Sequence, residues 1–482
     1  MHKIRPRHGT ASTAVGATPS AGAGTSWTLL ALLCVPQFMV ILDITIVNVA
    51  LPSIGRRLGF TPTDLQWVIS AYVLMTGGLM LLGGRSADLL GRRAVLLTGI
   101  GIFTAASLAS GLAASPAMLI GSRAAQGLGA ALLSPAALSC ITATYEGQHR
   151  TTALAVWGAL AGGGAAVGVL LGGILTSTLG WRSIFFVNVP VGLAALVLIT
   201  HTLPTGSRRA GWRQELDLPA ALSVASGLVA LVFGVRQSST WGLSDPKTLG
   251  LFALSAASLT GFAVIERRSR RPLVPPAIWR SRSLIVSSAL MLGATSILVG
   301  TFFLGSLFLQ RVQHTSPITT GLYFLPLVLV TGLGSHLGRE LLIRSGARVT
   351  AICGLALIAA GNLLLSGAGA ASSYLGGILP GFALVGFGVG LAFAAISVGA
   401  MADASEDQAG LASGLLTTGH ELGAAIGTAI VSNIAFGSGG TFATGYGHGA
   451  LAAAGVAVLF AVVVAVAMPT TRSTAGPQLA FH

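Results

Sequence analysis

The sequence predicts an all-α integral membrane protein with 14 transmembrane helices, arranged as two six-helix halves plus a two-helix insert. Three observations predict this architecture. Fourteen apolar stretches of bilayer-spanning length follow one another along the 482 residues. Only 8% of the residues are charged, whereas a soluble domain carries about 25%. Basic residues also cluster in every second gap between the stretches.

Each apolar stretch is expected to be one membrane span, because about 20 apolar residues at 1.5 Å rise per residue cross the hydrocarbon core as a helix. In chain order, the spans cover residues 27–51, 64–83, 94–113, 117–141, 152–177, 182–203, 217–236, 248–265, 284–310, 318–338, 349–367, 374–401, 410–434 and 448–468. The polar tails, residues 1–26 and 469–482, are expected to lie outside the bilayer.

The distribution of basic residues predicts how the spans are oriented. One set of alternate gaps, with the tails, holds 20 of the 27 lysines and arginines, and the other set holds six. The basic-rich side of a membrane protein is the cytoplasmic side, and an even number of spans then places both termini in the cytoplasm of a cell-membrane protein. The formal charge of +14 is explained by this pattern, so no nucleic-acid partner is expected.

A short internal repeat predicts the division into halves. The second span is followed by residues Gly84–Arg93, and the tenth span is followed by a weaker echo at Ile343–Arg348. Eight spans separate the two, and parallel six-helix repeats are a known transporter plan. We therefore expect a cytoplasmic tail, a first half, an insert, a second half and a second tail at residues 1–26, 27–203, 204–283, 284–468 and 469–482.

Several motifs together carry a family resemblance that extends over almost the whole chain. They are Leu42–Pro52, Gln66–Val68 with Tyr72, Gly84–Arg93, Arg123–Ala130, Trp181–Gly192, Arg271–Pro272 and Leu309–Gln310. In these motifs the chain resembles the major facilitator superfamily, and within it the fourteen-helix drug:proton antiporter branch. The resemblance implies the major facilitator fold. It also implies proton-coupled export, by alternating access, of a lipophilic small molecule such as a drug or antibiotic.

The fifth span departs from the pattern of that branch. Where the branch usually has a proline after a glycine, this chain has Val169 after Gly168. The glycines Gly164, Gly168 and Gly172 repeat every four residues, and Gly173 follows them. Such spacing predicts close helix packing. Two interpretations stay open: an ordinary helix contact, or a face that slides against the other half during transport.

Five ionisable residues are predicted deep in the spans, where a charge costs at least about 2.5–3.5 kcal/mol. They are Asp43, Arg123, His336, His420 and Glu421. Asp43 and Arg123 lie at similar distances from the outer ends of their spans, about 12 Å and 9 Å at helical rise. They form either a cavity-lining pair whose contact changes on protonation or a static ion pair. Glu421 is interpreted either as a carboxylate that carries a proton or pairs with a cationic drug, or as one that makes a packing hydrogen bond. His336 is expected at the interface.

Two further sets of residues are assigned from the motifs. The candidates for the substrate cavity are Asn48, Trp67, Tyr72, Gln126, Gln310 and His420. The candidates for a cytoplasmic gating loop are Gly84, Asp88, Gly91, Arg92 and Arg93. In that loop Gly91 permits a tight turn, and the arginines are expected to meet Asp88 and the carbonyl end of a neighbouring helix. The alternative is that these arginines act only as an orientation signal.

Other function classes are disfavoured by what the sequence lacks. It has no GxxxxGK[ST] loop, so the energy is expected to come from an ion gradient or from the gradient of the substrate. Its three cysteines show no metal spacing, and no cofactor or metal is expected. The expected partners are a small-molecule substrate, protons and membrane lipid, and the expected state is a monomer. The alternatives are a transporter of a metabolite or ion with the same fold, or a membrane-embedded enzyme or receptor.

Overall fold

The computed structural model describes residues 27–61, 64–145, 147–203, 218–269, 281–401, 409–437 and 440–468, and these residues are almost entirely helical. The elements are α1 (Trp27–Leu58), α2 (Trp67–Leu90), α3 (Arg92–Gly111), α4 (Pro116–Thr144), α5 (Gly147–Thr178), α6 (Ser183–Phe186), α7 (Asn188–Thr202), α9 (Leu218–Trp241), α10 (Pro246–Arg268), α11 (Arg282–Arg311), α12 (Pro317–Ser366), the π-helical turn η2 (Tyr374–Ile378), α13 (Leu379–Met401), α14 (Ala409–Gly437) and α15 (Phe442–Ala467).

These helices confirm the predicted fold class. Nine helices within the described residues are long and apolar enough to cross a membrane, and three shorter apolar helices lie within α2, α5 and α9. The number of helices differs from the number of spans in two places. The helices α6 and α7 form one span, Ser183–Thr202, and α12 is two helices joined at Gly346. With α14 added, the helices match the 14 predicted stretches, and the chain is a multi-pass membrane protein.

Several helices extend further at one end than the apolar stretches from which they were predicted. α1, for example, runs to Leu58 instead of ending near residue 51, and Arg56 and Arg57 lie in its last turn. Hydropathy marks only the part of a helix that lies in hydrocarbon, because the backbone hydrogen bonds continue beyond it into the interface. Such a helix end therefore lies outside the boundary expected from composition, whereas α2 begins later, at Trp67, and α3 ends earlier, at Gly111, than expected.

Two glycines with positive φ separate consecutive helices at corresponding places in the repeat. Gly91 (φ 95°, ψ 126°) stands between α2 and α3, and Gly346 (φ 82°, ψ 169°) divides α12. A side chain would strain this backbone conformation, which glycine adopts freely. The expected loop at Gly84–Arg93 was wrong in its extent, because α2 stays helical to Leu90 and α3 begins at Arg92. The turn itself is a single residue.

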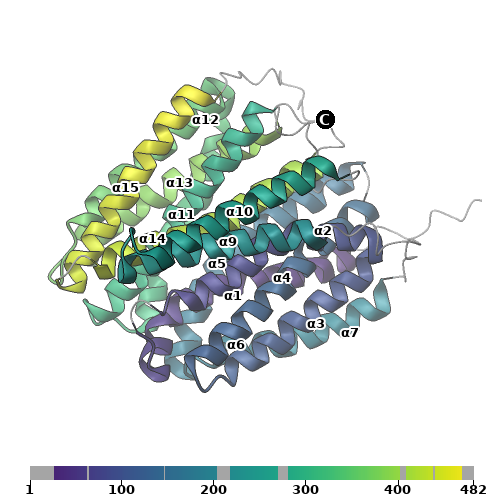
Figure 1. Cartoon of the computed structure of the whole chain (residues 1–482), viewed down its shortest axis with the longest axis horizontal. Coiled ribbons are helices and arrows are strands. Elements are labelled where there is room, and N and C mark those ends of the chain that lie inside the picture. Colours follow the sequence, from purple (N-terminus) through teal and green to yellow (C-terminus); the bar gives the residue numbers. More distant parts are fainter. Residues whose placement is uncertain are drawn as a thin grey trace, which may run out of the picture.

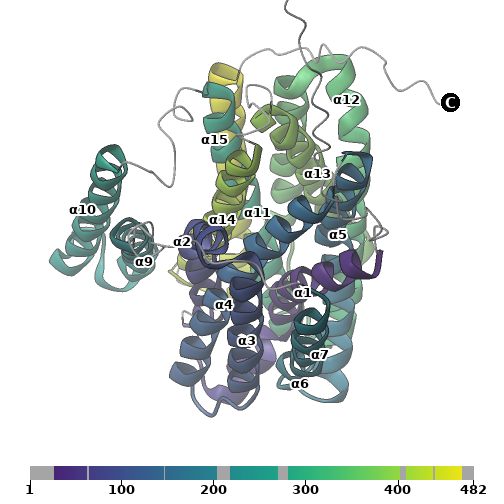
Figure 2. The same cartoon turned by 90° about the vertical axis from the view of Figure 1, so that its right-hand side faces the viewer.

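The helices pack into two groups with a peripheral pair. Figure 1 shows α1, α3, α4 and α7 in its lower part and α11–α15 at its upper left. The two groups meet where α5 packs on α12 and α2 packs on α14. α9 contacts both α2 and α14, while α10 packs on α9 (Figure 2). The exact domain boundaries stay a prediction.

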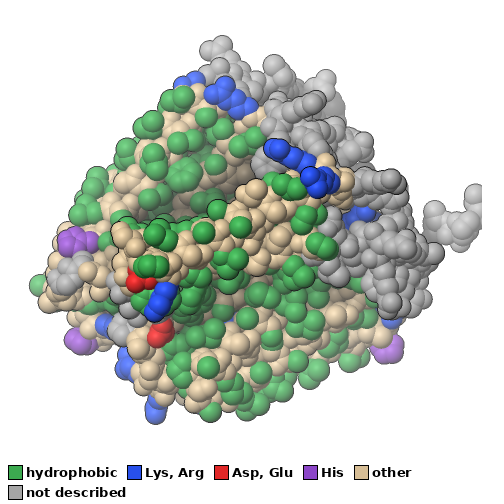
Figure 3. Space-filling view, in the orientation of Figure 1, with side chains coloured by type: hydrophobic (Ala, Val, Ile, Leu, Met, Phe, Trp, Pro, Cys, Tyr) green, Lys and Arg blue, Asp and Glu red, His purple; other side chains and the backbone are tan. Residues whose placement is uncertain are grey.

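The surface of the bundle suits a lipid solvent. Large apolar side chains are exposed on several helices, for example Val466 and Leu375, which are 75% and 74% exposed. Figure 3 shows hydrophobic side chains over most of one face, with Lys, Arg and His mainly near its ends. In water such a surface would drive aggregation, whereas in a bilayer the apolar belt faces hydrocarbon and the charged ends lie near the interfaces.

The glycine face of α5 packs on α1. A Cβ atom on Gly168 would overlap the side chain of Thr45, and one on Gly172 would lie 3.0 Å from the Cα of Ile46. Gly164 faces α1 in the same way. The interpretation of these three glycines as a face sliding against the other half was therefore wrong. Gly173 alone of the four meets the second group, where a Cβ would lie 2.8 Å from the Cα of Ile318.

Candidate functional site

A buried ion pair links α1 to α4. The Nη1 atom of Arg123 lies 2.5 Å from Oδ2 of Asp43, and each side chain is 1% exposed. Their predicted depths in the spans were similar, and the structure brings the two charges into direct contact. Isolated charges in such a place would be very costly, so each one persists only with a partner and further hydrogen bonds.

Polar side chains from three helices complete the shell around the Asp43 carboxylate. Its Oδ1 atom accepts from Nε2 of Gln126 at 2.9 Å and from Nδ2 of Asn188 at 3.2 Å. The Oγ atom of Ser107 lies 3.3 Å and 3.2 Å from these two amide nitrogens and donates to the carbonyl of Phe185 at 3.0 Å. Both carboxylate oxygens therefore have donors, and the ionised form of Asp43 fits the site.

The Arg123 guanidinium has partners besides Asp43. Its Nε donates to the carbonyl of Val68 at 2.9 Å, and its Nη1 donates to Oε1 of Gln126 at 2.7 Å. The Tyr72 ring centroid lies 4.3 Å from the guanidinium carbon, a distance at which a cation is attracted to the ring face. If Asp43 lost its charge, Arg123 would keep, within the described residues, neutral acceptors and the rings of Tyr72 and Phe185.

Two members of this network were not predicted as site residues. Asn188 belongs to a motif that the sequence displays, and it is the first residue of α7, after the short α6. A buried amide in an apolar span is a signal that could have identified it, because an unpaired amide in hydrocarbon is costly. Ser107 had no comparable signal, since a serine in a membrane helix usually bonds its own backbone.

The six candidates for the substrate cavity separate into different places. Tyr72 and Gln126 join the Asp43 network and are 0% exposed. Trp67 instead packs against Phe233 of α9, with ring centroids 5.7 Å apart. The carbonyl of Asn48 accepts from Oγ of Ser306 at 2.7 Å.

The last two candidates bond to other helices. Gln310 of α11 donates through Nε2 to the carbonyl of Val49 at 2.8 Å. Together with Asn48, it therefore lies at the contact between α1 and α11. The Nδ1 atom of His420 lies 3.0 Å from Oγ1 of Thr295, also on α11.

Glu421 lies where the two groups of helices meet. It is 5% exposed, and its Cβ would be 2.6 Å from a Cβ placed on Gly77 of α2. Its Oε2 atom has no hydrogen-bond partner within the described part of the chain. Tyr72, whose ring contacts Arg123, is also on α2.

The predicted gating residues surround the one-residue turn. Arg93 donates through Nη2 to the carbonyl of Thr200 at 2.6 Å, in the last turn of α7. A cation is favoured at this end of a helix. Arg92 is exposed and Gly84 is half-buried, and Gly91 is the turn itself. The side chain of Asp88 lies outside the described residues, so its expected contact with the arginines stays a prediction.

Comparisons with known proteins agree with this architecture. The chain is 40% identical over 427 residues to the puromycin resistance protein of Streptomyces alboniger, covering 87% of this chain and 84% of that protein. It is 38% identical over 456 residues to the cephamycin export protein of Amycolatopsis lactamdurans, covering 94% and 93%. A solved structure of a peptide transporter in complex with sulfate superposes with a TM-score of 0.67 at 15% identity, covering 92% and 96%.

The profile of one family also matches most of the chain. It is that of the Major Facilitator Superfamily, and it matches residues 33–428. The match includes the ion pair, the contacts of α5 with α12, of α2 with α14 and of α1 with α11, and Glu421. The resemblance seen in the motifs is thereby confirmed, as is the transporter class that it implied. The chain belongs to the Major Facilitator Superfamily of transporters.

Proposed function

We propose that this protein exports a lipophilic small molecule, of the drug or antibiotic class, out of the cytoplasm in exchange for protons. The export of a drug is supported by relatives whose names describe antibiotic resistance and export. The proton exchange is supported by one observation above the others, the buried pair of Asp43 and Arg123. Within the described residues, the one ion-pair partner of Asp43 is Arg123, so a single proton on the carboxylate changes the local charge balance.

The proposed proton step can be followed atom by atom. A proton that binds Oδ2 of Asp43 takes the place of the hydrogen bond from Nη1 of Arg123. Gln126 and the carbonyl of Val68 continue to accept from the guanidinium, so Arg123 stays partly satisfied. The ionic link between α1 and α4 is lost, and the hydrogen bond from Gln126 to Oδ1 of Asp43 remains. Loss of the proton restores the pair. The site therefore has two states of different charge with the same set of polar neighbours.

The proposed link to alternating access runs along α1. Asn48 lies five residues after Asp43, about 7.5 Å further along the helix. The carbonyls of Asn48 and Val49 accept hydrogen bonds from Ser306 and Gln310 of α11. A shift of α1 on protonation would therefore act directly on a contact between the two halves. By the predicted orientation, this contact closes the outer side.

Glu421 is proposed as the second functional carboxylate. Its position between α2 and α14, with Oε2 unpaired within the described residues, suits a group that meets a cationic substrate or a second proton when the halves separate. Asp43 is already surrounded by protein donors, so it has no free oxygen for a substrate. The two acids are thus proposed to have different roles, proton coupling for Asp43 and substrate selection for Glu421.

Asp88 is proposed to act in the gate and not in binding. Asp88 lies three residues before the turn at Gly91. It is therefore far along α2 from Val68 and Tyr72, the residues of that helix that contact Arg123. We expect Asp88→Asn to lower turnover more than substrate affinity, because it would weaken a latch without touching the site. Equilibrium dye binding and counterflow on the same preparation measure the two quantities. Lost binding with normal exchange would show that the latch proposal is wrong.

Transport itself can be tested in whole cells. A host lacking its own efflux pumps, with and without this gene, would be challenged with a panel of lipophilic antibiotics. Resistance that disappears with a protonophore supports proton-coupled export. Resistance that persists without a proton gradient would refute the coupling while leaving export intact. No effect on any antibiotic, with uptake of a metabolite instead, would favour the same-fold metabolite transporter.

A further inference from the structure

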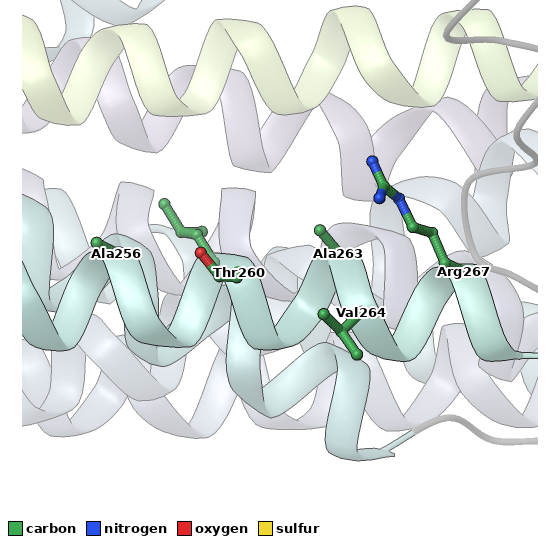
Figure 4. Close-up of a pocket in the computed structure, with 6 residues that line it drawn as sticks. Ala256, Thr260, Ala263, Val264 and Arg267 are labelled. Atoms are coloured by element: carbon green, nitrogen blue, oxygen red, sulfur yellow. The ribbon is translucent and has the colours of Figure 1, made fainter.

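A groove of about 410 Å³ runs along one face of α10. It is lined by Ala256, Leu259, Thr260, Ala263, Val264 and Arg267. These positions recur at three- and four-residue intervals and therefore share one side of the helix. Figure 4 shows the side chains of Ala256, Thr260, Ala263 and Arg267 pointing to the same side of α10. None of these residues belongs to the site around Asp43.

The groove has an apolar floor and one cationic end. Its lining from Ala256 to Val264 carries a single hydroxyl, on Thr260, and ends at the exposed Arg267 in the last turn of α10. The distance from Ala256 to Arg267 is about 16 Å at helical rise, close to half of the roughly 30 Å hydrocarbon core. The floor therefore has the depth of one leaflet, and the guanidinium reaches the level of the headgroups.

The surroundings leave this face open to an occupant from the bilayer. α10 packs on α9, and Figure 3 shows the surface hollowed between α10 and the helices of the second group. The lining of the groove is apolar apart from Thr260 and Arg267, which favours acyl chains over water or a free ion.

The charge at the end of the groove selects among lipids. Arg267 and its neighbour Arg268 are both exposed, and within the described residues Arg267 has no ion pair. A guanidinium binds a phosphate through two parallel hydrogen bonds. A lipid with net negative charge is attracted to the guanidinium. In a zwitterionic lipid the cationic part of the headgroup partly cancels that attraction. We propose that this groove binds one anionic phospholipid, with its acyl chains along Ala256–Val264 and its phosphate on Arg267.

The experiment counts lipids on the purified full-length protein. Native mass spectrometry would be run in detergent with phosphatidylglycerol or phosphatidylcholine of the same acyl chains. We expect one tight phosphatidylglycerol adduct. Arg267→Gln is expected to weaken it about fivefold, a change that corresponds to about 1 kcal/mol per basic residue near a membrane surface. Ala263→Trp, which fills the groove, is expected to displace it.

Matched variants decide whether the effect belongs to the groove. Arg268→Gln removes a neighbouring charge that does not line it, and Ala257→Trp adds the same bulk at an exposed position outside it. Both are expected to leave the adduct in place. Equal binding of the two lipids, or equal loss with Arg268→Gln, would overturn the proposal. Displacement of the lipid by inorganic phosphate alone would also overturn it, because the acyl chains would then contribute nothing.

Discussion

Asp43→Asn tests the proposed proton coupling most directly. The substitution keeps the size and one carbonyl oxygen of the side chain but removes its charge, so Arg123 stays buried with neutral partners. Two unit charges about 4 Å apart at an effective dielectric constant of about 20 attract each other by about 4 kcal/mol. That energy corresponds to a factor of roughly 10³ in an equilibrium constant. In Asp43→Asn this attraction is lost. A proton and Arg123 then no longer compete for the side chain at position 43.

The assay is drug-induced proton release from detergent-solubilised protein, followed with a pH dye. The wild type is expected to release protons when drug is added, and Asp43→Asn is expected to release none. Asp64→Asn is the matched control, because it is the same change at a half-buried acid that is bonded to Thr61 outside the network. Undiminished release from Asp43→Asn would refute the reasoning and would make Glu421 the next candidate.

A folding defect must be separated from lost coupling, because removing one partner of a buried pair destabilises a protein by about 3–5 kcal/mol. The double variant Asp43→Asn with Arg123→Gln removes the stranded charge as well. We expect it to regain thermal stability relative to Asp43→Asn while still releasing no protons. Recovery of both stability and proton release would show that the pair is only structural.

Three further experiments test separate parts of the structure. Glu421→Gln is expected to abolish resistance to cationic drugs while sparing neutral ones in a susceptibility panel, and a uniform loss would contradict its role in selection. Gly168→Leu is expected to lower the unfolding free energy by about 1–3 kcal/mol through overpacking against α1, measured by thermal unfolding in detergent, whereas Gly163→Leu, which faces open space, leaves it unchanged. Cysteines at Ser207 and Ser438, both outside the described residues, are expected to react from the cytoplasm and the exterior respectively, and the reverse labelling would invert the topology.

Sequence patterns predicted the fold because hydropathy and arginine placement report on the bilayer, which every span meets. They also predicted the depths of Asp43 and Arg123, because depth follows from counting residues along a helix. The sequence patterns did not predict which neighbouring helix each face of a helix packs against. Trp67 packs on Phe233, 166 residues later, and nothing local to either residue indicates that partner.

The same limit explains the glycines of α5 and the missed Asn188. A four-residue spacing states that a helix packs closely, but it does not state on which helix. Gly164, Gly168 and Gly172 could have met either half, and only the arrangement of the bundle assigns them to α1. Asn188 could be assigned only once the ion pair was known, because its amide donates a hydrogen bond to Asp43.

The single-residue turns at Gly91 and Gly346 also have a use in measuring motion. Because one residue joins α2 to α3, and one joins the two parts of α12, the helices on either side have almost no slack with which to separate. A pair of spin labels across either turn is expected to keep one distance distribution throughout the transport cycle. A pair across α2 and α14, beside Gly77 and Glu421, spans the contact that must open. The distances across the two glycine turns thus serve as constant internal references for measuring how far α2 and α14 separate.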